Sequence, residues 1–415
     1  MSRLRIVAVA FDYYPFDIRV RRMAEAAADA GHEMHIICLR ARSEAPHALC
    51  DGVVVHRLPL RRRFGMPLLE TLLSWLWFGM LAGALLSWQQ AQRAYDIVVI
   101  HNMPDFLVFC ALLPKLAGAK IVLDVEDVCP ELMAAKARGR TRALLERLAI
   151  WQERVSVAFS DHVITVGWPF EACLVRRHVP PAKLSLVINS ADPRLFPAAR
   201  RCPPPALATA GERAFVVMYY GTVAARNGVD TAVRAVALAQ RHVPHVQLRI
   251  MGHGEELPHL KRLAAELDIA ERVIFLEPCP SDTLVDFIVS GDIGIIPYRR
   301  DGFADLVLPT KAYELAWMRR PIIASDTVAI RSLFRPESIV LCDPTSPDAF
   351  ADAIVDLYRH PEKQATMIAC ATEDYTPYQW EAERQKYQAL LASLVPATAA
   401  GGTPAARVPT QTTRR

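Results

Sequence analysis

Residues 305–324 read DLVLPTKAYELAWMRRPIIA and combine a turn, a helix and a strand. The Pro-Thr-Lys turn at 309–311 leads into a short helix that carries Glu314. The helix ends at Arg320, and an apolar strand follows Pro321. A helix N-terminus with free backbone N–H groups and a lysine is suited to bind a diphosphate. A carboxylate one turn further on can accept hydrogen bonds from ribose hydroxyls.

Short apolar strands alternate with helical stretches on both sides of this segment, which indicates parallel βαβ units. The expected strands form two series, which in chain order are Leu4–Phe11, Met34–Leu39, Val53–Leu58, Ile97–His101, Ile121–Asp124, Val163–Val166 and Leu184–Asn189, then Phe215–Tyr220, Val246–Met251, Val273–Leu276, Ile293–Pro297, Ile322–Ala324 and Ile339–Cys342. Two series predict two doubly wound α/β domains, with the active site in the cleft between them at the carboxyl ends of the strands.

The domain boundaries follow from the same pattern. We expect a first domain over 1–195, a Pro-rich linker over 196–212 and a second domain over 213–376. A last helix is expected over 377–394. The final segment, 395–415, is low in hydrophobicity and is predicted to be disordered.

Composition excludes several classes of protein. The 415 residues are 52% hydrophobic and carry a net charge of +4, so a large core is available and no nucleic-acid partner is expected. The nine cysteines form no CxxC pair and have no zinc-type spacing, as in the reduced cysteines of a cytosolic protein. The N-terminus lacks the apolar segment and cleavage site of a signal peptide.

Several residues that suit phosphate binding follow predicted strands of the second series. Gly221 ends the strand FVVMYY, and Arg226 lies on the loop after it. Gly252 and Gly254 form a second strand-to-helix turn, where glycine allows the backbone to approach a ligand. Lys311 lies at a helix N-terminus, where a cation is mildly unfavourable unless an anion is bound there.

These motifs resemble the donor site of the retaining bacterial glycosyltransferases of family 4, which have the GT-B fold of two Rossmann-like domains. The LP-x-K-x-x-E segment and the opening YPFDxRVRR are similar to one subgroup of that family. The resemblance covers roughly residues 1–395. It implies a nucleoside diphosphate sugar, UDP- or GDP-linked, bound without a metal. The donor-binding residues it implies are Gly221, Thr222, Arg226, Gly252, Gly254, Pro309, Thr310, Lys311 and Glu314.

The chain departs from the family pattern at four positions. The family's first glutamate is Leu306 here, and the arginine and lysine that many members carry after the first glycine and before the second are Thr222 and Asn227. The family's D-x-H-D-x-x-P-E-L segment contains a histidine that faces the sugars, and that position is Glu126 here. The resemblance implies catalytic roles for Glu126, Asp127 and Glu314.

The first domain is expected to bind the acceptor. Arg19, Arg21 and Arg22 crowd the first turn of a helix, where three cations favour a phosphate or an acidic acceptor. Pairing with nearby acids is the alternative. His101 and Asn102 follow the fourth predicted strand and are further acceptor-side candidates.

Residues 71–88, TLLSWLWFGMLAGALLSW, contain no charge. Eighteen residues are borderline for a membrane span, and a span would separate strands of one sheet, so we exclude it. The helix is either a buried layer of the first domain or lies in the membrane interface. Trp75, Trp77 and Trp88, with the arginines that precede the stretch, favour the interface.

Together these features predict a retaining glycosyltransferase, of hexosyl or N-acetylhexosaminyl type, peripheral on the cytoplasmic face of a bacterial membrane. It would transfer a sugar to a glycan acceptor carried on a polyprenyl diphosphate, in surface polysaccharide or exopolysaccharide synthesis. Two alternatives remain. One is a sugar-nucleotide epimerase of the same fold, which would need no membrane helix. The other is a non-catalytic nucleotide-sugar-binding relative, which Glu126 and Leu306 favour.

Overall fold

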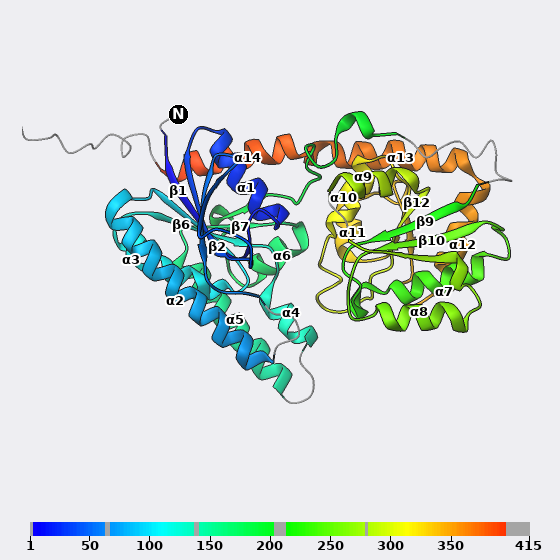
Figure 1. Ribbon diagram of the computed structural model, residues 1–415, viewed down its shortest axis with the longest axis horizontal. Helices are drawn as coiled ribbons and strands as arrows, with labels where there is room; N and C mark the ends of the chain where they lie inside the picture. Colours follow the sequence, from blue (N-terminus) through cyan, green and yellow to red (C-terminus); the bar gives the residue numbers. More distant parts are fainter. Residues whose placement is uncertain (1–2, 63–66, 137–140, 203–212, 279–280, 396–415) are drawn as a thin grey trace, which may run out of the picture. The chain divides into compact units, whose positions relative to one another are not determined.

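The structure is a computed structural model of the chain, and it describes residues 3–62, 67–136, 141–202, 213–278 and 281–395 (Figure 1). The predicted disordered tail, except for residue 395, and most of the predicted linker lie outside the described residues. The chain divides into two compact units. One consists of 1–101, 107–122 and 386–415, and the other of 102–106 and 123–385. The predicted domain boundaries therefore stay predictions.

The first series of strands forms an eight-stranded sheet with the order β3-β4-β2-β1-β5-β6-β7-β8. Its strands are β1 (Arg5–Tyr13), β2 (Glu33–Leu39), β3 (His47–Cys50), β4 (Val53–Leu58), β5 (Ile97–His101), β6 (Lys120–Val125), β7 (His162–Thr165) and β8 (Leu184–Leu186). β1 pairs with β2 and β5, and β2 pairs with β4; all three pairs are parallel, as βαβ units require.

The second series forms a six-stranded sheet with the order β11-β10-β9-β12-β13-β14. Its strands are β9 (Phe215–Tyr220), β10 (Val246–Met251), β11 (Val273–Leu276), β12 (Ile293–Ile296), β13 (Ile322–Ser325) and β14 (Val340–Cys342). All of its neighbouring strands are parallel. The prediction of two doubly wound α/β sheets is confirmed.

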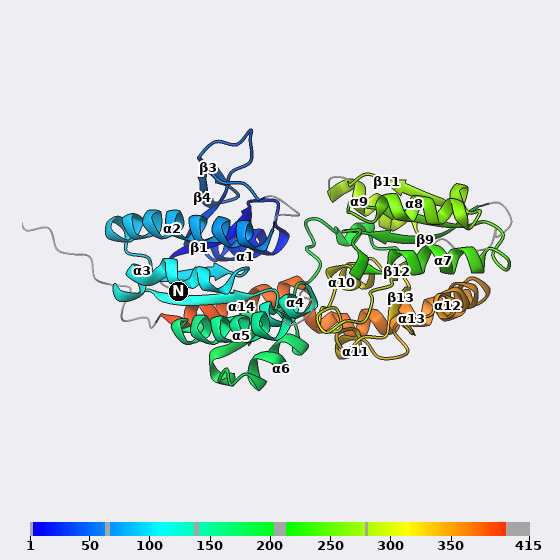
Figure 2. The same cartoon turned by 90° about the horizontal axis from the view of Figure 1, so that it is seen from below.

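Helices cover both faces of the six-stranded sheet (Figures 1 and 2). One face packs against α7 (Val229–Ala239), α8 (Leu257–Glu266) and α12 (Pro347–Arg359), through a core that includes Val233, Leu263 and Ile354. The other face packs against α9 (Ser281–Ser290), α10 (Thr310–Trp317) and α13 (Pro361–Tyr375), through a core that includes Ile288, Leu315 and Tyr375. Both faces are therefore buried, which explains why these strands are almost entirely apolar.

The helices near the eight-stranded sheet are α1 (Ile18–Asp29), α2 (Leu68–Arg93), α3 (Leu112–Leu116), α4 (Cys129–Lys136), α5 (Thr141–Phe159), α6 (Trp168–Arg176) and α14 (Trp380–Leu394). Asp17 caps α1, because its carboxylate accepts a hydrogen bond from the backbone N–H of Val20 at 2.9 Å. The last helix meets the first, since Nε2 of Gln388 donates to the carbonyl oxygen of Ala26 at 2.8 Å.

Helix α2 is longer than the apolar stretch that predicted it, and its two faces differ. Phe78, Ala82 and Leu86 are fully buried. Gln89 is also buried, and its side chain bonds to Nε2 of His56 at 3.1 Å and accepts from the Tyr95 hydroxyl at 3.2 Å. These buried side chains and the hydrogen bonds of Gln89 hold the inner face of α2 in the first compact unit.

The outer face of α2 is apolar and exposed. Its exposed side chains are Leu69, Leu73, Leu76, Trp77, Met80 and Trp88. By length and composition alone the helix could cross a membrane, and only 17% of its most apolar stretch is buried, unlike the core helix of a soluble protein. The strands on either side of it lie in one sheet, since Ile6 of β1 pairs with Ile97 of β5. The interpretation of α2 as a fully buried layer is therefore wrong.

One strand was not predicted. β3 pairs antiparallel with β4, with His47 opposite His56, and forms the edge of the eight-stranded sheet. Its side chains are half-buried or exposed, so it carries no continuous apolar signal. The helix predicted over 377–394 begins at Trp380, after a 3-10 turn at Thr376–Tyr378.

Candidate functional site

The carboxyl ends of β9, β10 and β12 bring the predicted donor-side residues together. Gly221 follows β9, Gly252 follows β10, and Tyr298 comes two residues after β12. These strands are neighbours in the six-stranded sheet, and α10 begins near the same edge with Thr310 and Lys311. Ligands of doubly wound sheets bind at this edge.

Lys311 lies in a cage of tyrosine rings. Its Nζ is 4.0 Å from the ring centroid of Tyr219, 5.3 Å from that of Tyr298 and 5.9 Å from that of Tyr220. The lysine is 7% exposed, and a Cβ added to Gly221 would lie 3.4 Å from Nζ. The ammonium group therefore faces the Gly221 turn.

The charge state of Lys311 is set by this cage. Burial lowers its pKa from the ordinary 10.5 to about 7, while the Glu314 carboxylate opposes that shift. Cation–π contacts with the rings offset part of the cost of burying an ammonium group. Lys311 is thus poised between its neutral and charged forms, and an anion bound beside it would favour the charged form.

Glu314 lies one turn further along α10, as predicted, and is half-buried. Burial raises the pKa of the Tyr220 hydroxyl, and the charge and hydrogen bond of Glu314 raise it further. Burial likewise raises the pKa of Tyr298 to about 12. The Tyr220 hydroxyl donates to the carbonyl oxygen of Lys311 at 3.4 Å, beside the Glu314 carboxylate.

The glycines of this edge are required by packing between loops. A Cβ on Gly252 would lie 1.9 Å from the carbonyl oxygen of Gly221, and one on Gly254 would lie 2.0 Å from that of Val223. Gly228 has φ +60, and its Cβ would lie 2.0 Å from the carbonyl oxygen of Pro297. The sequence suggested that Gly252 and Gly254 let the backbone approach a ligand, and the structure shows them letting one loop approach another.

Thr222 and Arg226 lie exposed on the loop after β9. The carbonyl oxygen of Thr222 accepts a hydrogen bond from the Tyr219 hydroxyl at 2.5 Å. The charge of Arg226 lowers the pKa of Tyr298, against the larger effect of burial. Pro309 is the extended residue before α10, and Thr310 begins the helix. The first N–H groups of a helix have no intrahelical partner, so those of Thr310 and Lys311 are suited to an anion.

Among the residues predicted to bind the acceptor, Asn102 follows β5 and organises the turn after β6. Its Oδ1 accepts from the backbone N–H of Glu126 at 2.9 Å and of Asp127 at 3.3 Å. Its Nδ2 donates to the carbonyl oxygen of Asp127 at 2.6 Å and to Oδ1 of Asp105 at 2.8 Å. Glu126 and Asp127 are both half-buried on this turn.

The predicted arginines lie on the first turn of α1. Arg19 and Arg22 are buried, at 5% and 3% exposed. Arg21 pairs with Glu25 at 3.3 Å in an i,i+4 arrangement, so pairing with a nearby acid accounts for this arginine.

His101 is buried at the end of β5. Among the described residues, His101, Asp124 and Glu126 form a group that could hold a metal ion, since one donor atom of each lies within 4.8 Å of the others. Its chemistry, a nitrogen and two carboxylates, suits several divalent metals. His101 and Asp124 are buried and Glu126 is half-buried, and no metal is assigned to this group.

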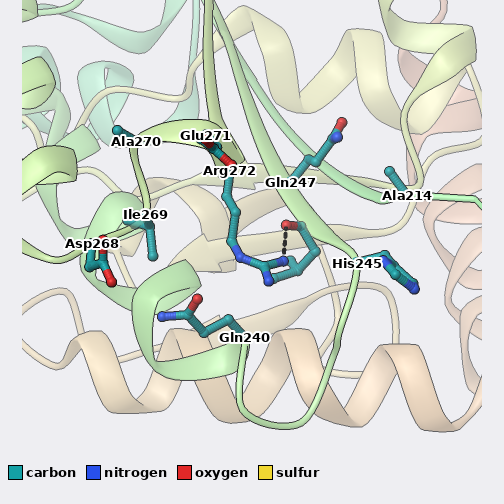
Figure 3. A pocket seen from close by; sticks show the side chains of 10 residues that line it. Ala214, Gln240, His245, Gln247, Asp268, Ile269, Ala270, Glu271 and Arg272 are labelled. Carbon is teal, nitrogen blue, oxygen red and sulfur yellow. Dashed lines mark hydrogen bonds between the residues drawn. The ribbon is translucent and has the colours of Figure 1, made fainter.

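A hollow of about 860 Å³ lies at the opposite edge of the six-stranded sheet (Figure 3). It includes Ala214 before β9, His245 before β10 and Arg272 before β11. Arg272 donates to the carbonyl oxygens of Pro244 and Val246, so its guanidinium is held by the rim. The amino ends of the strands form this edge, away from the lysine cage.

The tyrosines of the cage were not predicted as site residues from the sequence. Tyr219 and Tyr220 were read only as the end of an apolar strand, and Tyr298 as the residue after one. Three tyrosines at the carboxyl ends of neighbouring strands were the signal, but which of them faces Lys311 depends on side-chain direction.

Two family models match the chain. The first, described as a glycosyl transferase 4-like domain, matches residues 17–190, and the second, described as glycosyl transferases group 1, matches residues 214–360. Together the matches take in more than half of the chain.

Curated relatives are glycosyltransferases. The GDP-mannose-dependent alpha-(1-6)-phosphatidylinositol monomannoside mannosyltransferase of Mycolicibacterium smegmatis is 29% identical over 158 residues, which is 37% of this chain and 41% of that protein. D-inositol 3-phosphate glycosyltransferase 1 of Catenulispora acidiphila is 24% identical over 88% of this chain and 87% of its own. The chain spans less than half the length of the first relatives it matches.

Solved structures show the fold. The sucrose-phosphate synthase of Thermosynechococcus elongatus superposes with a TM-score of 0.75 at 19% identity, over 94% of this chain and 99% of that one. Anabaena HepE, solved in complex with UDP and glucose, superposes with a TM-score of 0.69 at 15% identity, over 94% of this chain and 100% of that one. The architecture is that of GT-B glycosyltransferases.

Proposed function

Since the chain belongs to the family of glycosyltransferases that the two domain models describe, we propose that it transfers a sugar from a nucleoside diphosphate sugar to a glycan acceptor, with retention of configuration. The relatives are glycosyltransferases, and neither the epimerase nor the non-catalytic alternative finds support among them.

The observation that carries the proposal is the cage around Lys311. A buried lysine with a pKa near 7 at a helix N-terminus, facing a glycine turn, is costly unless an anion is bound beside it. A diphosphate would meet the ammonium group and the N–H groups of Thr310 and Lys311. The Glu314 carboxylate, beside Tyr220, would then accept hydrogen bonds from the ribose hydroxyls, and Arg226 would supply a second positive charge for the diphosphate.

Catalysis would rest on positioning and on stabilisation of the leaving diphosphate. The helix N-terminus and Lys311 would stabilise the charge that develops on the leaving oxygen. Glu126 and Asp127 would lie on the acceptor side, where a carboxylate can orient or deprotonate a hydroxyl if its pKa is raised. No step of this proposal requires a metal.

The donor site can be tested by thermal shift. UDP-glucose, GDP-mannose and ADP-glucose are screened against the wild type and Glu314→Ala. The control is Glu266→Ala, at an exposed position of α8. One donor at a hundredfold excess over its Kd should stabilise the wild type and the control by about 2.7 kcal/mol. The shift should vanish in Glu314→Ala. Equal shifts in all three proteins would place the donor elsewhere, and no shift with any donor would contradict the proposed function.

We further propose that the exposed apolar face of α2 lies in the cytoplasmic surface of a membrane, where a lipid-diphosphate acceptor would be found. Trp77 and Trp88 are 52% and 58% exposed. Arg61 and Arg62 lie exposed shortly before the helix. Tryptophans and arginines flanking apolar side chains are typical of helices bound to anionic bilayers.

Membrane binding should therefore depend on the two tryptophans. The paired substitution Trp77→Ser and Trp88→Ser should lower partitioning onto vesicles of phosphatidylcholine and phosphatidylglycerol about thirtyfold, because each side chain loses apolar burial worth ~1 kcal/mol. Co-sedimentation measures the bound fraction. Leu49→Ser, which removes a 73% exposed leucine from β3, is the control and should bind as the wild type does. Equal binding by all three proteins would exclude this face as the contact.

A further inference from the structure

The side-chain amide of Asn102 has no hydrogen-bonding capacity left for a ligand. A carboxamide has two donors and an acceptor oxygen with two lone pairs. Here Oδ1 accepts from two backbone N–H groups of the 126–127 turn, and Nδ2 donates to two oxygens, one of Asp127 and one of Asp105. Both ends of the amide are therefore used in holding neighbouring groups in place.

The orientation of this amide is fixed by its partners. Rotation by 180° would put the NH₂ group against two backbone N–H donors and the oxygen against a carbonyl and a carboxyl oxygen. Four favourable contacts would become unfavourable, so the assignment is unique. Asn102 is also tied to β6 through its backbone, since its N–H donates to the carbonyl oxygen of Asp124 at 2.9 Å.

A buried acidic network holds Asp105 in turn. Asp105 is 1% exposed, and its Oδ1 accepts from Nδ2 of Asn102 and, at 3.5 Å, from Sγ of Cys129. Burial raises the pKa of Asp105, while the hydrogen bond from Asn102 opposes the shift. An ionised Asp105 thus depends on the Asn102 amide as much as the amide depends on it.

The same network reaches α6 through Arg177. Its guanidinium donates to both carboxylate oxygens of Glu153 at 2.6 and 2.8 Å and to Glu131 at 2.6 Å. Burial raises the pKa of Glu153 to about 7, and the Arg177 charge opposes this. Glu131 and Glu153 thus share the Arg177 guanidinium, and its charge also opposes the raised pKa of Asp105. Cys129 of α4, Gln152 of α5 and Cys173 of α6 also contribute polar groups to this network.

We infer that Asn102 is a positioning residue, which fixes the Glu126–Asp127 turn against the buried Asp105 rather than binding the acceptor itself. The inference rests on the proposed function only in that the turn carries the proposed acceptor-side carboxylates. A displaced turn would misplace both carboxylates, and a misplacement of about 1 Å can lower a rate about 10²-fold.

Hydrogen exchange at the turn tests this without an acceptor. Protection of the 123–128 peptide is measured by mass spectrometry in wild type, Asn102→Ala, Asn102→Asp and, as a control, Asn227→Ala in the 3-10 turn after β9. Asn102→Ala should lower protection of the turn about tenfold, because two backbone N–H groups lose their acceptor. Asn227→Ala should leave it unchanged.

The aspartate variant keeps the acceptor oxygen but places a second carboxyl group against Asp105. At pH 6 the two groups can share a proton, so protection should stay near that of the wild type. As pH rises to 8.5 the pair ionises and repels, and protection should fall. Rescue at low pH alone is a result that a general loss of packing would not give.

Three outcomes would overturn the inference: full protection in a folded Asn102→Ala protein, an equal fall in the 219–227 peptide, or no pH dependence in Asn102→Asp. If Asn102→Ala does not fold, the pH series on Asn102→Asp decides. Hydrolysis of UDP-glucose and GDP-mannose by the same proteins is measured separately. Exchange that behaves as expected in a wild type that turns over neither sugar nucleotide would support the positioning role and contradict the proposed donor activity.

Discussion

Lys311→Met is expected to weaken binding of the sugar nucleotide by about 10²- to 10³-fold while the free protein stays at least as stable as the wild type. Binding falls because the substitution removes the buried cation from the diphosphate position. Stability does not fall because a lysine with a pKa near 7 is costly to bury, and methionine fills a similar volume between the tyrosine rings without a charge. Calorimetry and thermal melts measure the two quantities.

The same lysine should make binding depend on pH. Its pKa in the folded protein is about 7, below the ordinary 10.5, so the free site loses its charge as pH rises through 7. Above pH 7 the protein must take up a proton when the diphosphate binds, and the affinity should fall by up to about tenfold per pH unit. Between 7 and 10.5 the unfolded chain holds more protons, so the lysine's contribution to stability rises with pH.

The control for this prediction is Lys261→Met. Lys261 lies on α8 with its Nζ 5.5 Å from the ring centroid of Phe275, so it shares the aromatic contact of Lys311 but lies outside the cage. Its replacement should leave affinity and pH dependence unchanged. A Lys311→Met protein that binds as the wild type does, or a loss in both variants, would show that the cage is not the anion site.

Gly252→Ala is expected to destabilise the protein by about 1–3 kcal/mol and to abolish donor binding, since a Cβ here would lie 1.9 Å from the carbonyl oxygen of Gly221. The clash is with backbone, so no side-chain rotation relieves it, and the Gly221 turn must move away from Lys311. Denaturant unfolding gives the free energy, and a donor titration gives the affinity.

Gly302→Ala is the matched control. A Cβ at Gly302 would meet nothing within 4 Å, and its φ lies outside the left-handed region. This variant should unfold within about 0.5 kcal/mol of the wild type, as exposed substitutions usually do. Equal losses in the two variants would mean that the loss in Gly252→Ala does not come from the contact between loops, since alanine acting through the unfolded chain would stabilise the protein.

The strands were predictable because both sheets are buried on both faces. Continuous apolar runs such as Ile97–His101 and Phe215–Tyr220 gave strand limits that agree with the structure. β3 was not predictable, because an edge strand with half its side chains exposed has no such run. The helix with Lys311 and Glu314 was found from its turn, its lysine and its spacing.

The parts of the site that escaped prediction depend on side-chain direction. That Nζ of Lys311 lies among Tyr219, Tyr220 and Tyr298 follows from rotamers and from strand neighbours far apart in sequence. Asn102 was expected to bind the acceptor because it follows a strand. Its amide instead uses its hydrogen-bonding groups on the turn after β6. The residues next to Asn102 in the sequence give no sign of these contacts.

The close packing of the loop after β9 on the loop after β10 also limits how the site can be rebuilt. The N–H of Val223 donates to the carbonyl oxygen of His253 at 2.8 Å, and that of Glu256 donates to Val223 at 3.2 Å. Gly252 and Gly254 leave no room for a side chain, so the backbones of the two loops are in direct contact. A chimera designed to take on the donor specificity of a relative should therefore replace both loops, 221–226 and 252–256, together with those of the relative.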